Sequence, residues 1–354
     1  MTTVTTRTTV TLQQAAELIA ACPKNRFLVR GEPGIGKSAI IKLLQEKTGY
    51  PAVYVDVPNM DLGDIAMPVI DHETKTTRYY PNGRFQFHLG KPVIIMLDEF
   101  SKGADPVKNM LHPLLEVNNP RLGDVPVPEG SIILLTGNLA SDGVNDSIKA
   151  HTQMRIGELE VSKPDSKQWL AWAADNNINP VIMAWVDRTP HALASYRDGD
   201  QQGNAFIFFP NTMQGAVVAP RTLELASNQV WARDKVDHHT LHAGMAGTVG
   251  LAAAASIASF IAHQDSLPSW KEITENPMTA RIPEQHGALA VLVYGAIERV
   301  TKDTLPAFLQ YIARADEEWQ CIFCIAMARN PRKQAMAFAC KEFAAWVAKN
   351  EDLL

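Results

Sequence analysis

The hydrophobic positions follow different patterns in the two halves of the chain. In the first half, short continuous apolar runs alternate with stretches in which apolar residues recur at helical spacing. The runs predict strands buried on both faces at residues 27–29, 53–57, 92–97 and 131–136. The helical stretches lie at residues 12–21, 39–47 and 105–116. Because strands and helices alternate, this half is predicted to form a parallel α/β sheet.

After about residue 163, every predicted element is a helix. These helices cover residues 166–176, 180–186, 221–233, 241–263, 288–300, 305–314, 317–329 and 333–349. Prolines separate many of them, because proline cannot continue a helix. We therefore predict an α/β core at residues 1–164, followed by all-α regions at 165–263 and 264–354.

Two short segments of the first half fall outside this alternation. Residues 67–71 and 76–80 are predicted to pair as a hairpin around 72–75. Residues 120–128 predict a second small hairpin or loop. Both are polar inserts that the core pattern does not require.

The composition indicates the cellular compartment of the protein and the class of its partners. Charged residues make up 20% of the 354 residues and hydrophobic residues 46%, which predicts a folded chain with a sizeable core. The formal net charge of −5 gives no overall basic character, so nucleic-acid binding is not favoured. Four cysteines form no disulfide framework, and the threonine-rich start has no apolar signal core. A reducing, cytoplasmic setting is expected.

Two stretches could suggest a membrane span or a metal site, but each is better explained as part of the buried core. Residues 243–262 carry no charged side chain, but they are mostly small, so a helix buried among other helices is favoured over a membrane span. Cys321 and Cys324 form a lone C-x-x-C in an apolar helical stretch, which favours buried core thiols over a metal site.

A glycine-rich loop joins the first predicted strand to the next helix. Its sequence fits the pattern G-x-x-x-x-G-K-[ST], whose N–H groups and following helix can surround phosphate oxygens. Lys37 is expected to reach the β- and γ-phosphates of ATP, and Ser38 to bind Mg²⁺. The predicted nucleotide-binding residues are Gly31, Glu32, Pro33, Gly34, Ile35, Gly36, Lys37, Ser38 and Ala39.

Polar residues follow two further buried strands. Asp98 is expected to hold Mg²⁺, directly or through water, and Glu99 to orient and deprotonate the attacking water. Asn138 ends the next strand, where it could hold that water against the γ-phosphate or simply occupy a turn. Arg155 and Arg221 could each be no more than a solvated surface charge.

The order of these stretches resembles the MoxR-type AAA+ ATPases, especially the forms in phage and bacterial genomes. The six segments are residues 31–38, Asp61-Leu62-Gly63-Asp64, Leu97-Asp98-Glu99-Phe100, Thr136-Gly137-Asn138, 145–148 leading to Arg155, and Pro220-Arg221-Thr222. The resemblance covers residues 12 to about 262. The first and third segments are shared by many nucleotidases, whereas the complete order is specific to this branch.

The resemblance implies roles for individual residues. It implies Walker A at residues 31–38, Walker B at Asp98 and Glu99, sensor 1 at Asn138, an arginine finger at Arg155 and sensor 2 at Arg221. It also implies an AAA+ core with an all-α lid, a hexameric ring, and inserts that face its central pore. Met154 and Lys149 depart from the family pattern near the finger, and residues 264–354 carry no recognised motif.

Two classes of function follow from this resemblance. The first is a ring-forming Mg-ATP hydrolase that remodels a partner protein, such as one with a von Willebrand factor A domain. The second is an AAA+ nucleic-acid motor or loader, which the net charge disfavours because DNA binding depends on phosphate neutralisation. A nucleotide-gated scaffold without hydrolysis is a third interpretation, and Glu99 argues against it.

Overall fold

The computed structural model describes residues 8–139, 150–210, 212, 215–265, 267–350 and 352. The chain divides into two compact units. The first, here called the α/β unit, comprises residues 1–163 with 209–212, and the second, the helical unit, comprises residues 164–208 with 213–354.

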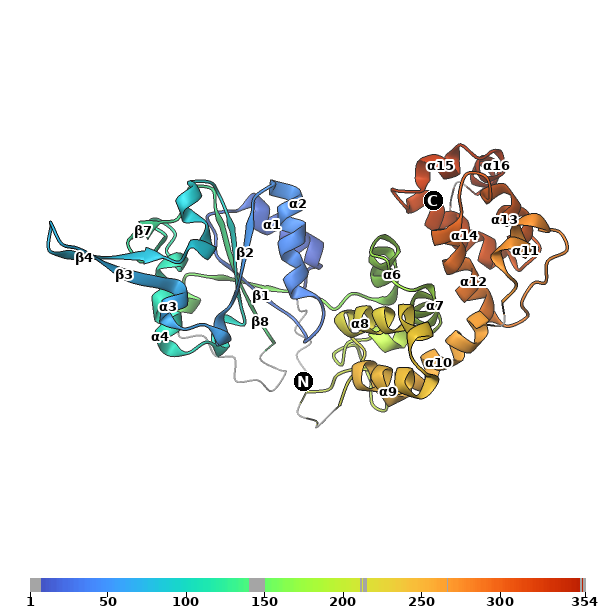
Figure 1. The fold of residues 1–354 in the computed structure, drawn as a ribbon, viewed down its shortest axis with the longest axis horizontal. Coiled ribbons are helices and arrows are strands. Elements are labelled where there is room, and N and C mark those ends of the chain that lie inside the picture. The colour runs from blue at the N-terminus through green and yellow to red at the C-terminus, as the bar shows by residue number, and fades with distance from the viewer. Residues whose placement is uncertain are drawn as a thin grey trace, which may run out of the picture. The chain divides into compact units, whose positions relative to one another are not determined.

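A five-stranded parallel sheet forms the centre of the α/β unit (Figure 1). Its order is β2-β5-β8-β1-β9, so the strand that precedes the glycine-rich loop lies between two others. The strands are β1 (Phe27–Arg30), β2 (Ala52–Asp56), β5 (Ile94–Asp98), β8 (Ile132–Gly137) and β9 (Gly157–Glu160). The predicted parallel α/β fold is confirmed.

Alternate strand residues build two separate cores, one on each face of the sheet. One core packs Val29, Met96 and Leu134 against α1 and α2. The other packs Leu28, Leu97 and Leu135 against the segments around α3 and α4. The helices of this unit are α1 (Leu12–Ala21), α2 (Ile40–Thr48), α3 (Leu62–Ile65), α4 (Asp105–Leu111) and α5 (Ala150–Gln153). Burial on both faces explains why the central strands β5 and β8 are almost entirely apolar.

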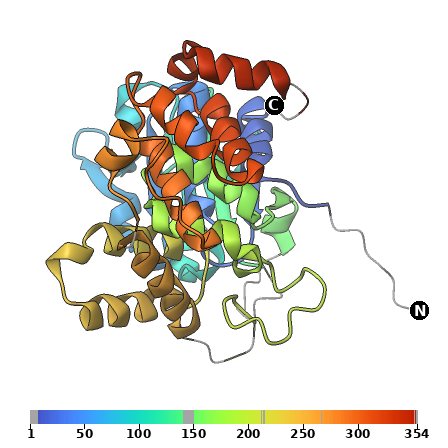
Figure 2. The same ribbon diagram turned by 90° about the vertical axis from the view of Figure 1, so that its right-hand side faces the viewer.

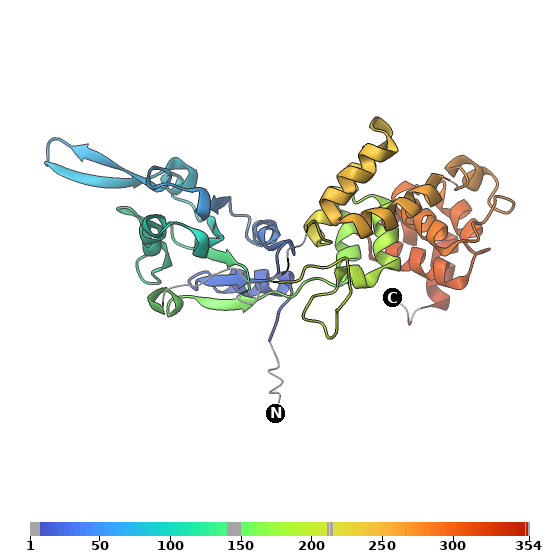
Figure 3. The same cartoon turned by 90° about the horizontal axis from the view of Figure 1, so that it is seen from below.

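Two antiparallel hairpins accompany the sheet. Strands β3 (Ala66–Asp71) and β4 (Thr76–Pro81) form the predicted longer hairpin, and β6 (Arg121–Leu122) with β7 (Val125–Pro126) forms the shorter one. The N–H and C=O groups of Tyr79 bond to Asp124, which joins the two hairpins. The β3–β4 hairpin projects away from the sheet in Figures 1 and 3.

The helical unit consists of packed helices, seen in green to red in Figure 2. Its core contains three fully buried tryptophans, Trp169, Trp185 and Trp319. The helices are α6 (Ser166–Asp175), α7 (Pro180–Arg188), α8 (Pro220–Trp231), α9 (His238–Val249), α10 (Leu251–Asp265), α11 (Trp270–Glu275), α12 (His286–Arg299), α13 (Leu305–Ile312), α14 (Glu317–Arg329), α15 (Gln334–Phe338) and α16 (Lys341–Lys349).

Several predicted helix boundaries were wrong. The single helix expected over 241–263 is two helices, because Gly250 adopts φ 89° and ends α9. The helix expected over 333–349 is likewise divided into α15 and α16, and α11 was not predicted. The helix predicted over 105–116 ends at Leu111, and Pro113 lies in the 3₁₀ turn η6 (His112–Leu115) that follows. None of the described helices has the length and apolar character needed to cross a bilayer.

The C-x-x-C pair lies in α14. Cys324 is fully buried in the helical core and Cys321 is partly buried. Burial raises the pKa of the Cys324 thiol to about 12, so this sulfur stays protonated at neutral pH. Cys324 therefore packs as a small apolar side chain, as the sequence favoured.

Candidate nucleotide-binding and hydrolysis site

The glycine-rich loop connects β1 to α2 at the carboxyl edge of the sheet. Gly34 and Gly36 have φ values of 75° and 94°, in the left-handed region that residues with a Cβ disfavour. These two positions let the loop turn sharply before the 3₁₀ turn η1 (Lys37–Ala39) leads into α2. The local geometry is that of a strand–loop–helix phosphate site.

The Lys37 ammonium group lies across this loop. It donates to the carbonyl oxygens of Gly31 (2.8 Å) and Glu32 (3.0 Å) and to Asn138 Oδ1 (3.1 Å). The contact with Asn138 joins the loop to the end of β8, 101 residues further along the chain. Two of the predicted site residues are thus brought together directly.

Asp98 ends β5 with both carboxylate oxygens hydrogen-bonded. Tyr54 Oη donates to Oδ2 at 2.6 Å, and the Thr136 hydroxyl donates to Oδ1. Tyr54 belongs to β2 and Thr136 to β8, the two strands on either side of β5. Neighbouring strands therefore fix the orientation of this carboxylate.

Glu99 follows in a left-handed conformation, with φ 49°. Its backbone N–H donates to Thr136 Oγ1 at 3.2 Å. Its carboxylate forms an ion pair with Lys102 Nζ at 2.8 Å, at the end of the 3₁₀ turn η5 (Phe100–Lys102). A non-glycine residue in this backbone region is uncommon and often marks a functional site.

Arg30 holds the other side of the site. It is the last residue of β1, and its buried side chain donates to the backbone carbonyl of Asn138 at 2.7 Å. It also pairs with Glu158 of β9 at 2.9 Å. This role of Arg30 was not predicted from the sequence. The available signal was a charged residue at the end of an otherwise apolar strand, directly before the glycine-rich loop.

Arg155 lies elsewhere in the same unit. It precedes β9, whose first residue Gly157 pairs with Phe27 at the start of β1. The loop instead follows Arg30 at the other end of this 4-residue strand, about 10 Å away at the usual rise per residue. Arg155 contacts Glu116 at 2.5 Å and the ring of His112. It thus lies at the amino edge of the sheet, whereas the loop lies at the carboxyl edge.

The family model of the AAA domain (dynein-related subfamily) matches residues 26–138. This chain carries an AAA+ ATPase domain. The matched segment begins one residue before β1 and ends at Asn138, so it contains the loop, both acidic residues and the residue that contacts Lys37. A comparison with curated protein sequences finds no match.

Two solved structures illustrate more distant similarity. A candidate ATPase from Cytophaga hutchinsonii has 12% identity and a TM-score of 0.34, with 67% of this chain and 80% of that chain covered. NtrX from Brucella abortus, in complex with ADP, has 15% identity and a TM-score of 0.38, with 97% and 67% covered. Both TM-scores are low, so the site of the AAA domain rests on its own geometry.

The oxygen donors of the AAA domain fit Mg²⁺. This ion prefers oxygen ligands and is usually held by one or two carboxylates together with substrate phosphates. Asp98 offers a carboxylate and Ser38 a hydroxyl group. The described residues contain no cluster of three or more His, Cys, Asp or Glu side chains that could hold a metal, and such a cluster is not needed for this kind of site.

The remaining predictions concern Arg221 and two segments of the family pattern. Arg221 is the second residue of α8 in the helical unit and is exposed. The segment Asn145-Asp146-Ser147-Ile148 and Lys149 lie outside the described residues. Asp61 and Asp64 cap α3 reciprocally, and Asp64 pairs with Arg84 at 2.7 Å, so this family segment has a structural role at the base of the longer hairpin.

Proposed function

We propose that this chain is a MoxR-like Mg-ATP hydrolase that forms a homo-oligomeric ring and remodels a partner protein. One observation carries the hydrolysis part of this proposal. Lys37, Asp98, Glu99 and Asn138 extend from the carboxyl ends of β1, β5 and β8, which are adjacent strands in one parallel sheet. Ligands of open α/β sheets bind at this edge.

Each residue then has a definite task. The loop N–H groups of residues 31–39 hold the phosphates, and Lys37 moves from its carbonyl partners to the β- and γ-phosphate oxygens. Ser38 and Asp98 are the residues that would hold Mg²⁺, which would supply positive charge to the phosphates when bound. Glu99 accepts the proton of the attacking water, and Asn138 orients that water. Arg30 fixes the backbone of Asn138, and Tyr54 with Thr136 fixes Asp98.

The ring part of the proposal rests on Arg155. Arg155 lies at the amino edge of the sheet, so it does not face the loop of its own chain. In the proposed ring it would leave Glu116 and reach the loop of a neighbouring copy. Such an arginine stabilises the charge of the transferring phosphoryl group. Arg221 acts within its own subunit and couples the helical lid to the nucleotide. A hexamer is the ring size that the family resemblance favours.

The partner part rests on charge and on the exposed hairpin. Met67, Val69 and Ile70 of the β3–β4 hairpin are half exposed or more. We assign these side chains to the partner-binding surface, because contiguous exposed apolar patches mark protein-interaction sites. The net charge of −5 disfavours binding to the negatively charged backbone of nucleic acids. The proposed client, the partner protein that is remodelled, is a cytoplasmic protein with a von Willebrand factor A domain. The alternative is an AAA+ nucleic-acid motor or loader.

Nucleotide titration tests the loop assignment. Lys37→Ala should weaken ATP binding at least tenfold, or about 1.4 kcal/mol, because the charge that faces the β- and γ-phosphates is lost. Lys42→Ala is the matched control, since Lys42 is an exposed residue of the following helix. Equal ATP affinity for wild-type protein and Lys37→Ala would refute the assignment.

Stimulation of turnover separates the two client classes. Glu99→Gln should bind ATP and hydrolyse it very slowly, which holds the chain in its ATP-bound form for capture of a partner. Proteins retained by this variant with ATP, and not with ADP, can be identified by mass spectrometry and added to wild-type protein. Stimulation by such a protein supports remodelling, whereas stimulation by DNA alone supports the motor.

A further inference from the structure

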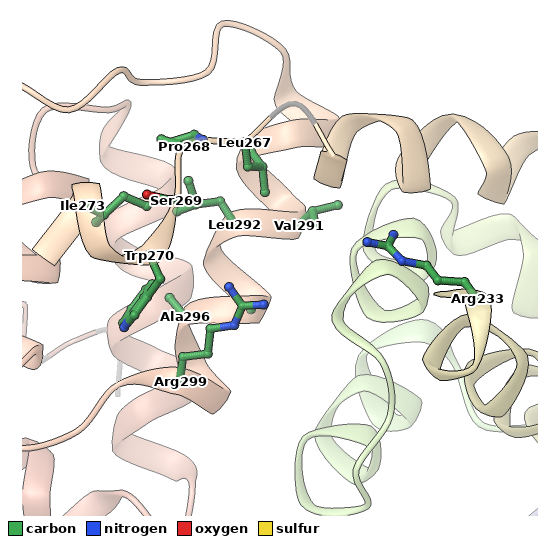
Figure 4. Close-up of a pocket in the computed structure, with 11 residues that line it drawn as sticks. Arg233, Leu267, Pro268, Ser269, Trp270, Ile273, Val291, Leu292, Ala296 and Arg299 are labelled. Carbon is green, nitrogen blue, oxygen red and sulfur yellow. The ribbon is translucent and has the colours of Figure 1, made fainter. Parts of the chain in front are cut away.

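A cavity of about 240 Å³ lies within the helical unit. Three segments surround it: the 3₁₀ turn η9 (Arg233–Lys235), residues 267–269 with the start of α11, and α12 (Figure 4). The cavity belongs to this unit alone, because all of its lining residues lie between 233 and 299.

The inner wall of the cavity is apolar and firmly packed. Ile273, Leu292 and Ala296 are buried in the core of the unit. Trp270 stacks on Phe308 of α13, with ring centroids 5.5 Å apart, so its indole is held in place. An apolar group that enters this cavity meets a preformed surface, which keeps the entropic cost of binding low.

The rim of the cavity is cationic. Arg233 and Arg299 extend from opposite sides towards the same space in Figure 4. The lining residues include no aspartate or glutamate, although Arg233 forms an ion pair with the neighbouring Asp234 at 3.7 Å. Arg299 is exposed and has no hydrogen bond or ion pair within the described part of the chain. Its guanidinium group is therefore available to an anion from outside.

We infer that this cavity binds an apolar side chain flanked by carboxylates on a partner polypeptide. The size argues for one or two side chains, because small-molecule sites usually occupy roughly 300–1,000 Å³. The rim argues for carboxylates, because the guanidinium fork binds them in a bidentate manner. Apolar burial gives the affinity, and the exposed Arg299 selects an acidic sequence. This site is independent of ATP hydrolysis.

Peptide binding to the full chain tests the inference. The probe is a blocked, fluorescent hexapeptide, Asp-Asp-Leu-Leu-Asp-Asp, measured by anisotropy at low salt. Replacing both leucines by serine, or all aspartates by lysine, should each weaken binding at least tenfold. Raising the salt concentration should weaken it further, since the rim is exposed and screened.

Protein variants locate the peptide. Arg299→Glu should weaken binding at least tenfold and leave basal ATP turnover unchanged. Arg332→Glu is the control, an equal charge reversal at an exposed arginine of the same unit, and it should bind the peptide as wild-type does. The inference would be overturned if Arg299→Glu and Arg332→Glu lost peptide affinity equally, or if the serine peptide bound as tightly as the leucine peptide. Full competition by oligo-dT of the same charge would also overturn it.

Discussion

At the scale of single residues, the ion pair between Glu99 and Lys102 bears on how the site is controlled. The proposed base can accept a proton from water only when its carboxylate turns towards the nucleotide. In this structure the carboxylate is instead held 2.8 Å from Lys102 Nζ, a residue of its own 3₁₀ turn. In the proposed mechanism, the ion pair with Lys102 therefore competes with the catalytic position of Glu99.

Lys102→Met should raise the basal kcat for ATP. The two side chains are 31% and 42% exposed, and exposed ion pairs contribute about 0.2–1 kcal/mol, so the gain is limited to about fivefold. KM should not change, since Lys102 does not hold the phosphates. Lys102→Arg keeps the pair and should behave as wild-type in the same steady-state assay. A lower kcat in Lys102→Met would mean that the lysine assists the reaction.

Some contacts of the site could be predicted from the sequence, whereas others depend on the order of the strands in the sheet. Lys37, Asp98 and Asn138 each end or follow an apolar run, and parallel strands place such residues at one edge. The hydroxyl of Tyr54 on Asp98 was not predictable, because it depends on which strand lies beside β5. Arg30 was missed for the same reason, since its partners lie 108 residues away and on β9.

At the scale of elements, Gly250 decides where α9 ends. Its φ of 89° is combined with ψ of 155°, a region that only glycine occupies readily. A Cβ at this position would also lie 2.5 Å from the carbonyl oxygen of Ala216. Apolar periodicity continues through this glycine, which is why the sequence predicted one helix where the structure has two.

Gly250→Ala should destabilise the helical unit by about 1–3 kcal/mol, since the backbone strain and the contact with Ala216 add. Gly247→Ala is the matched control in the preceding helix, where an added Cβ meets nothing within 4 Å. The control should be neutral or stabilising by about 0.5–1 kcal/mol. Chemical denaturation of both variants measures the difference, and equal stability would show that the chain relaxes around the added methyl group at little cost.

The β3–β4 hairpin is the element that the proposed function assigns to the client or the pore. Val69 and Ile70 are 50% and 62% exposed, so replacing both by threonine should not weaken the fold. Basal ATP turnover should remain, and stimulation by the partner protein should be lost. Replacing both residues by alanine is a second test, because alanine has a lower β propensity than threonine. Cross-links that place this hairpin only on the outer rim of a ring would contradict the assignment.

At the scale of the whole molecule, the proposal requires a site shared between two chains. Arg155→Ala should fold and bind ATP but lose about 10³-fold or more in turnover. Glu116→Gln breaks the same surface ion pair while it keeps the arginine, so it should retain activity. Mixing Arg155→Ala with Lys37→Ala subunits should restore some turnover, because certain interfaces then combine an intact loop with an intact arginine.

Protein concentration gives an independent check of the shared site. Specific activity of the wild-type chain should rise with concentration until rings are complete, as measured together with mass by light scattering. Constant specific activity down to demonstrated monomers would exclude a site that needs a neighbour.

The loop and Arg155 lie at opposite edges of the same sheet, and this has a genetic consequence. Each chain in a ring would border two sites, one through its loop and one through its arginine. An allele that removes both features would silence both of those sites. A cell that makes normal and doubly altered chains in equal amounts would then keep about a quarter of its sites intact. An allele that removes only one of the two features would leave about half of them intact. The allele that removes both features would be dominant in merodiploid cells, because the altered chain still folds and enters the rings.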